Sequence, residues 1–177
     1  TPHRTKSVSS IGTFALRDAS ATGIALPFGS SDHAALTALA AAASRHGIAE
    51  FRLAPHHALL AIGAPPAFAA EADVLGFVTA PDDPRTRISA CIGSDGCASG
   101  HIPARAVAAR LAPHLAPETT LHVSGCAKGC AHPRPADVTL VGRADGYGLV
   151  IEGMAGDTPQ ALLRTDQLES AVARRQG

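Results

Sequence analysis

The four cysteines of the chain form two close pairs. Five residues separate Cys91 from Cys97, and three separate Cys126 from Cys130. Both pairs lie in glycine-rich, turn-prone stretches, SACIGSDGCASG and SGCAKGCAHP. Four thiolates that converge on one point need a strongly cationic centre such as zinc or an iron-sulfur cluster. The pattern therefore predicts one metal site whose ligands are Cys91, Cys97, Cys126 and Cys130.

The spacing within the pairs favours a 4Fe-4S cluster. Structural zinc sites place roughly two to four residues between paired cysteines, so the second pair fits zinc and the first is too wide. Two disulfides are disfavoured, because nothing marks the chain as secreted and 177 residues can bury a core without covalent cross-links. Zinc, disulfides and unrelated buried thiols remain open alternatives at this point.

Composition limits the classes of partner. The chain has 15 Lys and Arg and 15 Asp and Glu, so no net charge attracts nucleic acid. It has no apolar run of the roughly 18 residues that a membrane span needs. We expect a globular protein of the reducing cytoplasm that binds neither nucleic acid nor membrane. Because Thr1 opens the chain without a leader, we interpret the chain as part of a longer polypeptide or as a processed subunit.

The first part of the chain has the pattern of an antiparallel sheet covered by helices. Extended segments near 11–18 and 24–26 predict a hairpin, and 50–53, 58–62 and 77–79 predict further strands. One helix is expected from Ser31 or Asp32 to Ala43, ending at Gly47, and another from Pro66 to Gly76. This order predicts an α+β fold. The run from Pro81 to Pro84 then suggests a boundary.

The second part is predicted to present both cysteine pairs at strand ends. Segments 87–90 and 121–124 are strand-like, and a cysteine pair begins just past the end of each of them. A helix begins near Ile102, a hairpin covers 138–141 and 149–152, and a helix from 165 to 175 closes the chain. Open α/β sheets gather ligands just beyond strand ends, which fits a cluster site there.

The two cysteine motifs, the helix between them and the strands after them resemble the cluster-binding half of the siroheme-type sulfite and nitrite reductase superfamily. The string SGCAKGCAHP looks most like its cobalamin-pathway branch, since the reductases usually have Pro-Asn where this chain has Ala127 and Lys128. The resemblance implies a ferredoxin-like half-domain at 1–80, an α/β 4Fe-4S cluster domain at 85–157 and a C-terminal helix at 158–177. It also implies that the first of two related halves is missing.

The resemblance further implies an oxidoreductase of the monooxygenase type in aerobic cobalamin biosynthesis. Its reaction would be the oxygen-dependent hydroxylation and γ-lactone formation that convert precorrin-3A to precorrin-3B. The partners would be precorrin-3A, O2, the missing first half and a reduced electron donor, NADH-linked or ferredoxin-like, whose electrons the cluster relays. The alternatives are a siroheme-dependent sulfite or nitrite reductase, in which Cys130 would bridge to the haem-like iron, and a non-catalytic iron-sulfur electron-transfer subunit.

A precorrin carries many carboxylates, so its pocket needs local cations although the chain is neutral overall. The candidates flank the cysteine motifs and are Lys128, Arg134, Arg105 and His132. For each of them, substrate contact and ordinary surface solvation are equally compatible with the sequence.

Two other roles follow less directly from the sequence. A mononuclear non-haem iron would need two histidines and a carboxylate, and His101 and His132 lie nearest the cysteine loops. The amides of the motif glycines are candidate donors to cluster sulfur, although these glycines also allow tight turns; they are Gly93, Gly96, Gly125 and Gly129. The sequence identifies no catalytic residue.

Overall fold

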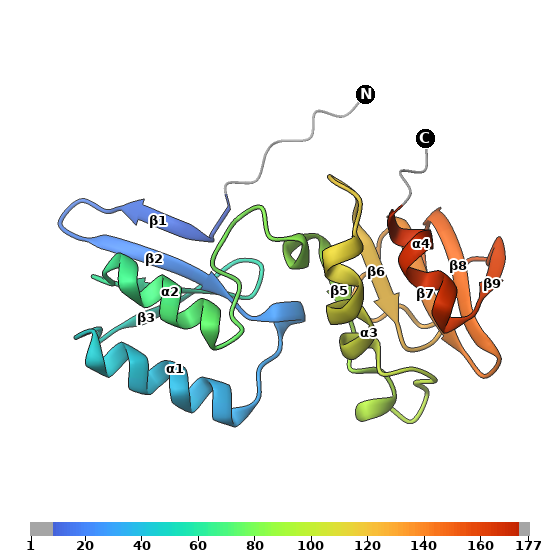
Figure 1. Ribbon diagram of the computed structural model, residues 1–177, viewed down its shortest axis with the longest axis horizontal. Coiled ribbons are helices and arrows are strands. Elements are labelled where there is room, and N and C mark those ends of the chain that lie inside the picture. Colours follow the sequence, from blue (N-terminus) through green and yellow to red (C-terminus); the bar gives the residue numbers. More distant parts are fainter. Residues whose placement is uncertain (1–8, 174–177) are drawn as a thin grey trace. The chain divides into compact units, whose positions relative to one another are not determined.

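A computed structural model describes residues 9–173 and divides the chain into two compact units, with the boundary between Thr86 and Arg87. The first unit has a four-stranded sheet with helices, and the second has a five-stranded sheet with helices (Figure 1). The α+β class predicted from the sequence is confirmed.

The sheet of the first unit is antiparallel throughout, in the order β1-β2-β4-β3. Its strands are β1 (Gly12–Ala15), β2 (Ser20–Ala25), β3 (Phe51–Ala54) and β4 (Ala58–Ile62). The helices are α1 (His33–Arg45) and α2 (Pro66–Val74), and short 3-10 turns are η1 (Pro27–Gly29) and η2 (Pro84–Arg87). Figure 1 shows both α-helices running beside this sheet.

Local signals set the ends of α1 and α2. The carboxylate of Asp32 accepts a hydrogen bond from the amide of Ala35 at 2.7 Å, which satisfies one of the free donors at the start of α1. Pro66 opens α2, where a missing amide proton costs little. Gly47 and Gly76 follow the two helices with positive φ, of 70° and 91°, which a residue without Cβ adopts freely.

The core of the first unit lies between its sheet and these helices. Ile24 from β2, Leu39 from α1 and Phe68 from α2 are 0–3% exposed and belong to one cluster. Phe77 joins the same cluster at 1% exposure. The strand expected at 77–79 is reduced to one bridge between Val78 and Ala25, because Val78 pairs with the end of β2 and its neighbours do not continue the ladder.

The sheet of the second unit has the order β5-β6-β7-β8-β9. The first three strands are parallel and the last three antiparallel; they are β5 (Ile88–Ala90), β6 (Leu121–Ser124), β7 (Ala136–Arg143), β8 (Gly146–Gly153) and β9 (Ala161–Leu163). The helical elements are η3 (Gly93–Asp95), α3 (Ala104–Leu111), η4 (Ala112–His114), η5 (Thr165–Gln167) and α4 (Leu168–Ala173). A parallel pair needs a crossover, which α3 supplies between β5 and β6.

Alternation along β6 and β7 gives the second sheet two different faces. Leu121 and Val123 point to one face, where α3 contacts β5 and β6. His122 points to the opposite face, and the register places Thr139 of β7 beside it. Both residues are 0% exposed, so this second face is also covered and contains buried polar groups.

The structure refines the sequence prediction for the end of the chain. The hairpin expected at 138–141 and 149–152 is longer, because β7 and β8 continue to a tight turn between Arg143 and Gly146. Strand β9 was not predicted. The helix expected at 165–175 corresponds to η5 and α4 as far as residue 173, and its last two positions lie outside the described residues.

Within residues 9–173, no helix has both the length and the apolar character needed to cross a membrane.

Candidate metal centre

Two adjacent parallel strands bring the cysteine motifs to one edge of the second sheet. Cys91 follows the last residue of β5 directly, and Cys126 lies two residues beyond the end of β6. Because β5 and β6 run parallel, with Ala90 opposite Val123, both motifs leave the sheet at the same end. The fold therefore places the start of each cysteine loop beside the other.

The two loops are in direct contact. The amide of Gly125 donates a hydrogen bond to Sγ of Cys91 at 3.1 Å. The carbonyl of Gly125 accepts from the amide of His101 at 2.8 Å. A Cβ atom on Gly125 would lie only 2.7 Å from Cα of Gly93. Such a close approach of two main chains requires glycine on both sides.

Gly93 is the most tightly enclosed residue of the first loop. Its φ is 64°, and a Cβ there would lie 2.1 Å from the carbonyl oxygen of Ile102. Beside it, the amide of Ser94 donates to that same carbonyl at 2.8 Å, and the amide of Cys97 donates to the carbonyl of Gly93 at 2.9 Å. These contacts fix the loop between Cys91 and Cys97 against the segment that leads into α3.

All four thiols are free, and no two of them form a disulfide. Cys91 and Cys126 are partly buried, whereas Cys97 and Cys130 are exposed. Within residues 9–173, no three Cys, His, Asp or Glu side chains are gathered closely enough to hold a metal ion. The two loops thus lie together, but within the described residues the side chains of the four cysteines do not meet at one point.

The residues present nevertheless fit an iron-sulfur cluster. Four unpaired thiols are the donor set that such clusters use, and a backbone amide already donates to one of these sulfurs. Of the four motif glycines considered from the sequence, Gly125 is the one whose amide donates to a cysteine sulfur among the described residues. The amide of Gly96 instead donates to the carbonyl of Gly93 at 3.3 Å, so it is engaged in the turn.

The four cationic candidates have different surroundings. Lys128 is exposed, and its Nζ donates to Oγ of Ser99 at 3.0 Å, which links the second cysteine loop to the first. Arg134 is exposed after the second pair. Arg105 is partly buried on α3, and among the described residues its Nε has no hydrogen-bond partner.

His132, the fourth candidate, packs against a histidine that the sequence did not single out. His122 is 0% exposed, and neither ring nitrogen has a hydrogen-bond partner in the described part of the chain. The ring centroids of His122 and His132 are 5.6 Å apart, at an interplanar angle of 55°. His101, also considered as a metal ligand, is exposed and is not part of this pair.

No family model matches the chain. Over 183 residues it is 41% identical to the precorrin-3B synthase of Sinorhizobium sp., a match that covers 98% of the chain. The chain resembles precorrin-3B synthase. This is the cobalamin-pathway branch to which the string SGCAKGCAHP pointed, so the resemblance found in the sequence is confirmed.

The match to precorrin-3B synthase covers 40% of that protein, so the chain spans about two fifths of its curated relative. Among solved structures, the chain is similar to the NirA protein of Mycobacterium tuberculosis, with a TM-score of 0.77 and 24% identity. This likeness covers 98% of the chain and 38% of NirA. It shows that the chain shares its fold with this part of NirA.

The buried His122 predicts a stability change in mildly acidic solution. Burial, and secondarily the neighbouring His132, lower the pKa of His122 from 6.5 to about 4. Between these values the unfolded chain binds a proton that the folded chain excludes, so the free energy of unfolding falls as pH falls. We expect a loss on the order of 3 kcal/mol across this window. Urea unfolding of the metal-free protein from pH 7 to pH 4.5 would measure most of it.

The matched control for this pH dependence is His122→Gln, which keeps a polar side chain but cannot titrate. The variant should show a flatter pH profile between pH 6.5 and 4.5. Glu71 and Asp166 have pKa values held below their usual range by arginine partners, so their contributions appear at lower pH. An unchanged slope in the variant would mean that His122 is not the responsible group.

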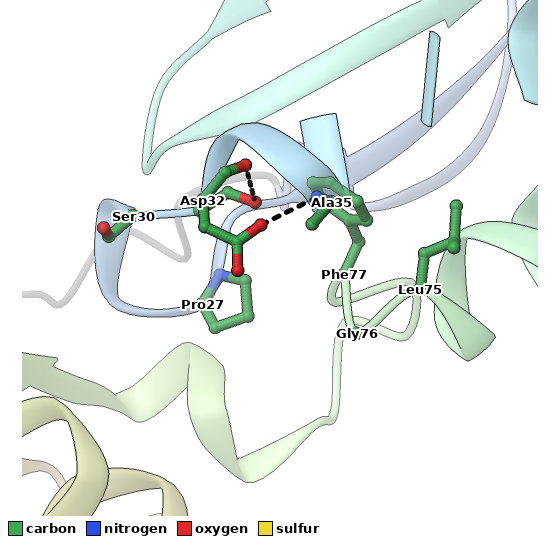
Figure 2. Close-up of a pocket in the computed structure, with 8 residues that line it drawn as sticks. Pro27, Ser30, Asp32, Ala35, Leu75, Gly76 and Phe77 are labelled. Carbon is green, nitrogen blue, oxygen red and sulfur yellow. Dashed lines mark hydrogen bonds between the residues drawn. The ribbon is translucent and has the colours of Figure 1, made fainter. Parts of the chain in front are cut away.

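A cavity of about 170 Å³ lies in the first unit, between the start of α1 and the end of α2. Figure 2 shows Pro27, Asp32 and Phe77 on its walls, with the carboxylate of Asp32 bonded to the amide of Ala35. Asp32 is the one ionisable side chain of the lining, and it is occupied in capping α1. The cavity therefore offers no catalytic group, and the cysteine loops remain the candidate site.

Proposed function

We propose that the chain is the cluster-carrying part of a precorrin-3B synthase. The observation that supports this most strongly is the 41% identity to such an enzyme along nearly the whole chain. The whole protein would catalyse the oxygen-dependent hydroxylation and γ-lactone formation that convert precorrin-3A to precorrin-3B. In this proposal the first unit is the ferredoxin-like half-domain at 1–80 and the second contains the cluster domain at 85–157. The C-terminal helix expected at 158–177 corresponds, within the described residues, to β9 followed by η5 and α4.

The proposed ligands of a 4Fe-4S cluster are Cys91, Cys97, Cys126 and Cys130. When bound, the cluster would supply one-electron transfer, which protein side chains do not provide. Cys91 and Cys126 lie just past strand ends, and the amide of Gly125 donates a hydrogen bond to the sulfur of Cys91. Lys128 ties the loops together through Ser99 and adds a positive charge beside the site.

Arg105 and Arg134 are the proposed cationic contacts to the carboxylates of the precorrin. Arg105 is partly buried on α3, with its Nε buried and without a partner among the described residues, and a guanidinium binds a carboxylate through two parallel hydrogen bonds. Lys128 could contribute only by exchanging its bond to Ser99. Since the chain spans two fifths of its relative, the rest of the protein would complete the pocket and receive electrons from a cytoplasmic donor.

We assign only the cluster, and no second iron, to the described residues. A mononuclear non-haem iron would need two histidines and a carboxylate, and the two histidines considered for it have different surroundings, since His101 is exposed and His132 packs against His122. Substrate and O2 would meet at a centre to which the remainder of the protein contributes.

The test uses the full-length protein, purified without oxygen and analysed for iron, sulfide and zinc before turnover with precorrin-3A. We expect equal amounts of iron and sulfide from the cluster, a broad visible absorption and oxygen-dependent formation of precorrin-3B. Sharp siroheme bands with no turnover would favour the reductase alternative. Zinc without sulfide would contradict both enzymes and leave a non-catalytic metal module.

A further inference from the structure

Two neighbouring strands place Ser89 and His122 side by side on the covered polar face of the second sheet. The parallel register pairs Ser89 of β5 with His122 of β6, so both side chains point to the same face. His132 belongs to the segment that returns from Cys130 toward β7. Its Nδ1 lies 3.4 Å from Oγ of Ser89, and its ring centroid lies 5.6 Å from that of His122. The side chain of His132 therefore contacts both β5, through Ser89, and β6, through His122.

His122 is an unusual residue for this position. It is 0% exposed and neither ring nitrogen has a hydrogen-bond partner among the described residues, and burying a polar ring without such a partner is unfavourable. Burial keeps the ring neutral by lowering its pKa to about 4. A neutral imidazole has one N–H donor and one acceptor nitrogen, and buried groups of this kind are almost always hydrogen-bonded. The nearest ring that could complete the pair is that of His132.

We propose that Ser89, His122 and His132 form a hydrogen-bonded dock that fixes the segment after Cys130 on the sheet. In this dock, His132 bonds to Ser89 through Nδ1 and packs its ring against that of His122. The proposal adds a hydrogen bond from Nε2 of His132 to one of the two ring nitrogens of His122, neither of which has a partner among the described residues. Since Nδ1 already faces Ser89, Nε2 is the atom available to His122. The dock assigns His132 a positioning role in place of substrate contact.

The dock would determine where Cys130 lies. The amide of His132 donates to the carbonyl of Gly129 at 3.1 Å, so residues 129–132 form a single turn with Cys130 inside it. Gly129 has a φ of 63°, and a Cβ there would lie 3.7 Å from Cε1 of His122. One end of the turn thus lies close to His122 and Ala155, and the other end carries His132. The turn is a property of the metal-free fold, whereas its consequence for a cluster rests on the function proposed above.

Hydrogen-deuterium exchange of the metal-free protein tests the dock without reference to any cofactor. The main variant is His122→Leu, which fills a similar volume and removes both ring nitrogens. We expect the amide of His132 to exchange roughly tenfold faster, because the turn that protects it would open more often. The matched control is Thr139→Val, since Thr139 is also fully buried beside His122 but bonds to the carbonyl of Gly153 instead. The control should leave exchange in the turn unchanged.

Two further variants keep the proposal testable should His122→Leu fail to fold. His122→Gln retains a donor and an acceptor and should restore most of the protection, and Ser89→Ala should weaken it by removing the other partner of His132. Exchange at His132 that is the same in the wild type, His122→Leu and Ser89→Ala would overturn the dock. After reconstitution, a changed electron paramagnetic resonance spectrum of the reduced cluster in His122→Leu would show that the dock also influences the position of Cys130 at the cluster. Failure of every variant and the wild type to bind iron would count against the proposed function and leave the exchange result standing.

Discussion

Replacing any one of the four cysteines by alanine is expected to lower the bound iron and sulfide of the anaerobically purified protein by roughly tenfold. Alanine offers no ligand atom, so one iron of the cluster would lose its protein attachment. Cys97 and Cys130 are exposed, so in the metal-free protein their replacement should leave the far-ultraviolet circular dichroism and the unfolding temperature unchanged. Metal analysis of the four variants beside the wild type measures the effect.

Cys91→Ala should differ from the other cysteine variants in stability. The sulfur of Cys91 accepts a hydrogen bond from the amide of Gly125, and removing it leaves that buried amide unpaired. We expect an additional loss of about 1–3 kcal/mol in the metal-free protein. Ser94→Ala, in the same loop and exposed, is the matched control and should keep both cluster and stability. A cysteine variant that retained full iron and sulfide would show that its thiol is not a ligand.

Features that depend on residues close in sequence could be predicted well. The start of α1 needs only Asp32 and the amide of Ala35, three residues apart, and the ends of α1 and α2 need only a following glycine. The same holds for the cysteine motifs, since Cys91 directly follows one short strand and Cys126 follows another after one intervening glycine. Helix caps and turns depend on a few neighbouring residues, so they can be predicted from the sequence alone.

Features that depend on strand pairing could not be predicted. His122 is a polar residue of a short strand, and its neighbours Ser89 and His132 are distant in sequence. The parallel register of β5 and β6 makes Ser89 and His122 adjacent, and the segment after Cys130 brings His132 to both. In the same way, Lys128 was considered as a substrate contact, because its bond to Ser99 of the other loop leaves no trace in the sequence. Strand β9 is short and mostly exposed, so it carries no apolar alternation that would identify it.

Gly93→Ala is expected to destabilise the second unit by about 2–5 kcal/mol. Part of this cost is the positive φ of 64°, which a residue with a Cβ adopts unfavourably. The larger part is steric, because the new Cβ would lie 2.1 Å from the carbonyl oxygen of Ile102 and 2.6 Å from the amide nitrogen of Ala104. Both are main-chain atoms, so the clash cannot be relieved by turning a side chain. Denaturant unfolding of the metal-free protein would measure the loss.

Gly47→Ala separates the two contributions to this loss. Gly47 has a similar φ of 70°, but a Cβ there would meet no atom within 4 Å, so only the backbone cost of about 1–2 kcal/mol applies. Gly125→Ala gives the complementary case, since its Cβ would press on Cα of Gly93 at 2.7 Å. If Gly93→Ala cost no more than Gly47→Ala, the close contact of the cysteine loops would not be a rigid feature of the fold. A larger loss in both Gly93→Ala and Gly125→Ala, with less iron bound on reconstitution, would establish that the loops must touch before the cysteines can share a cluster.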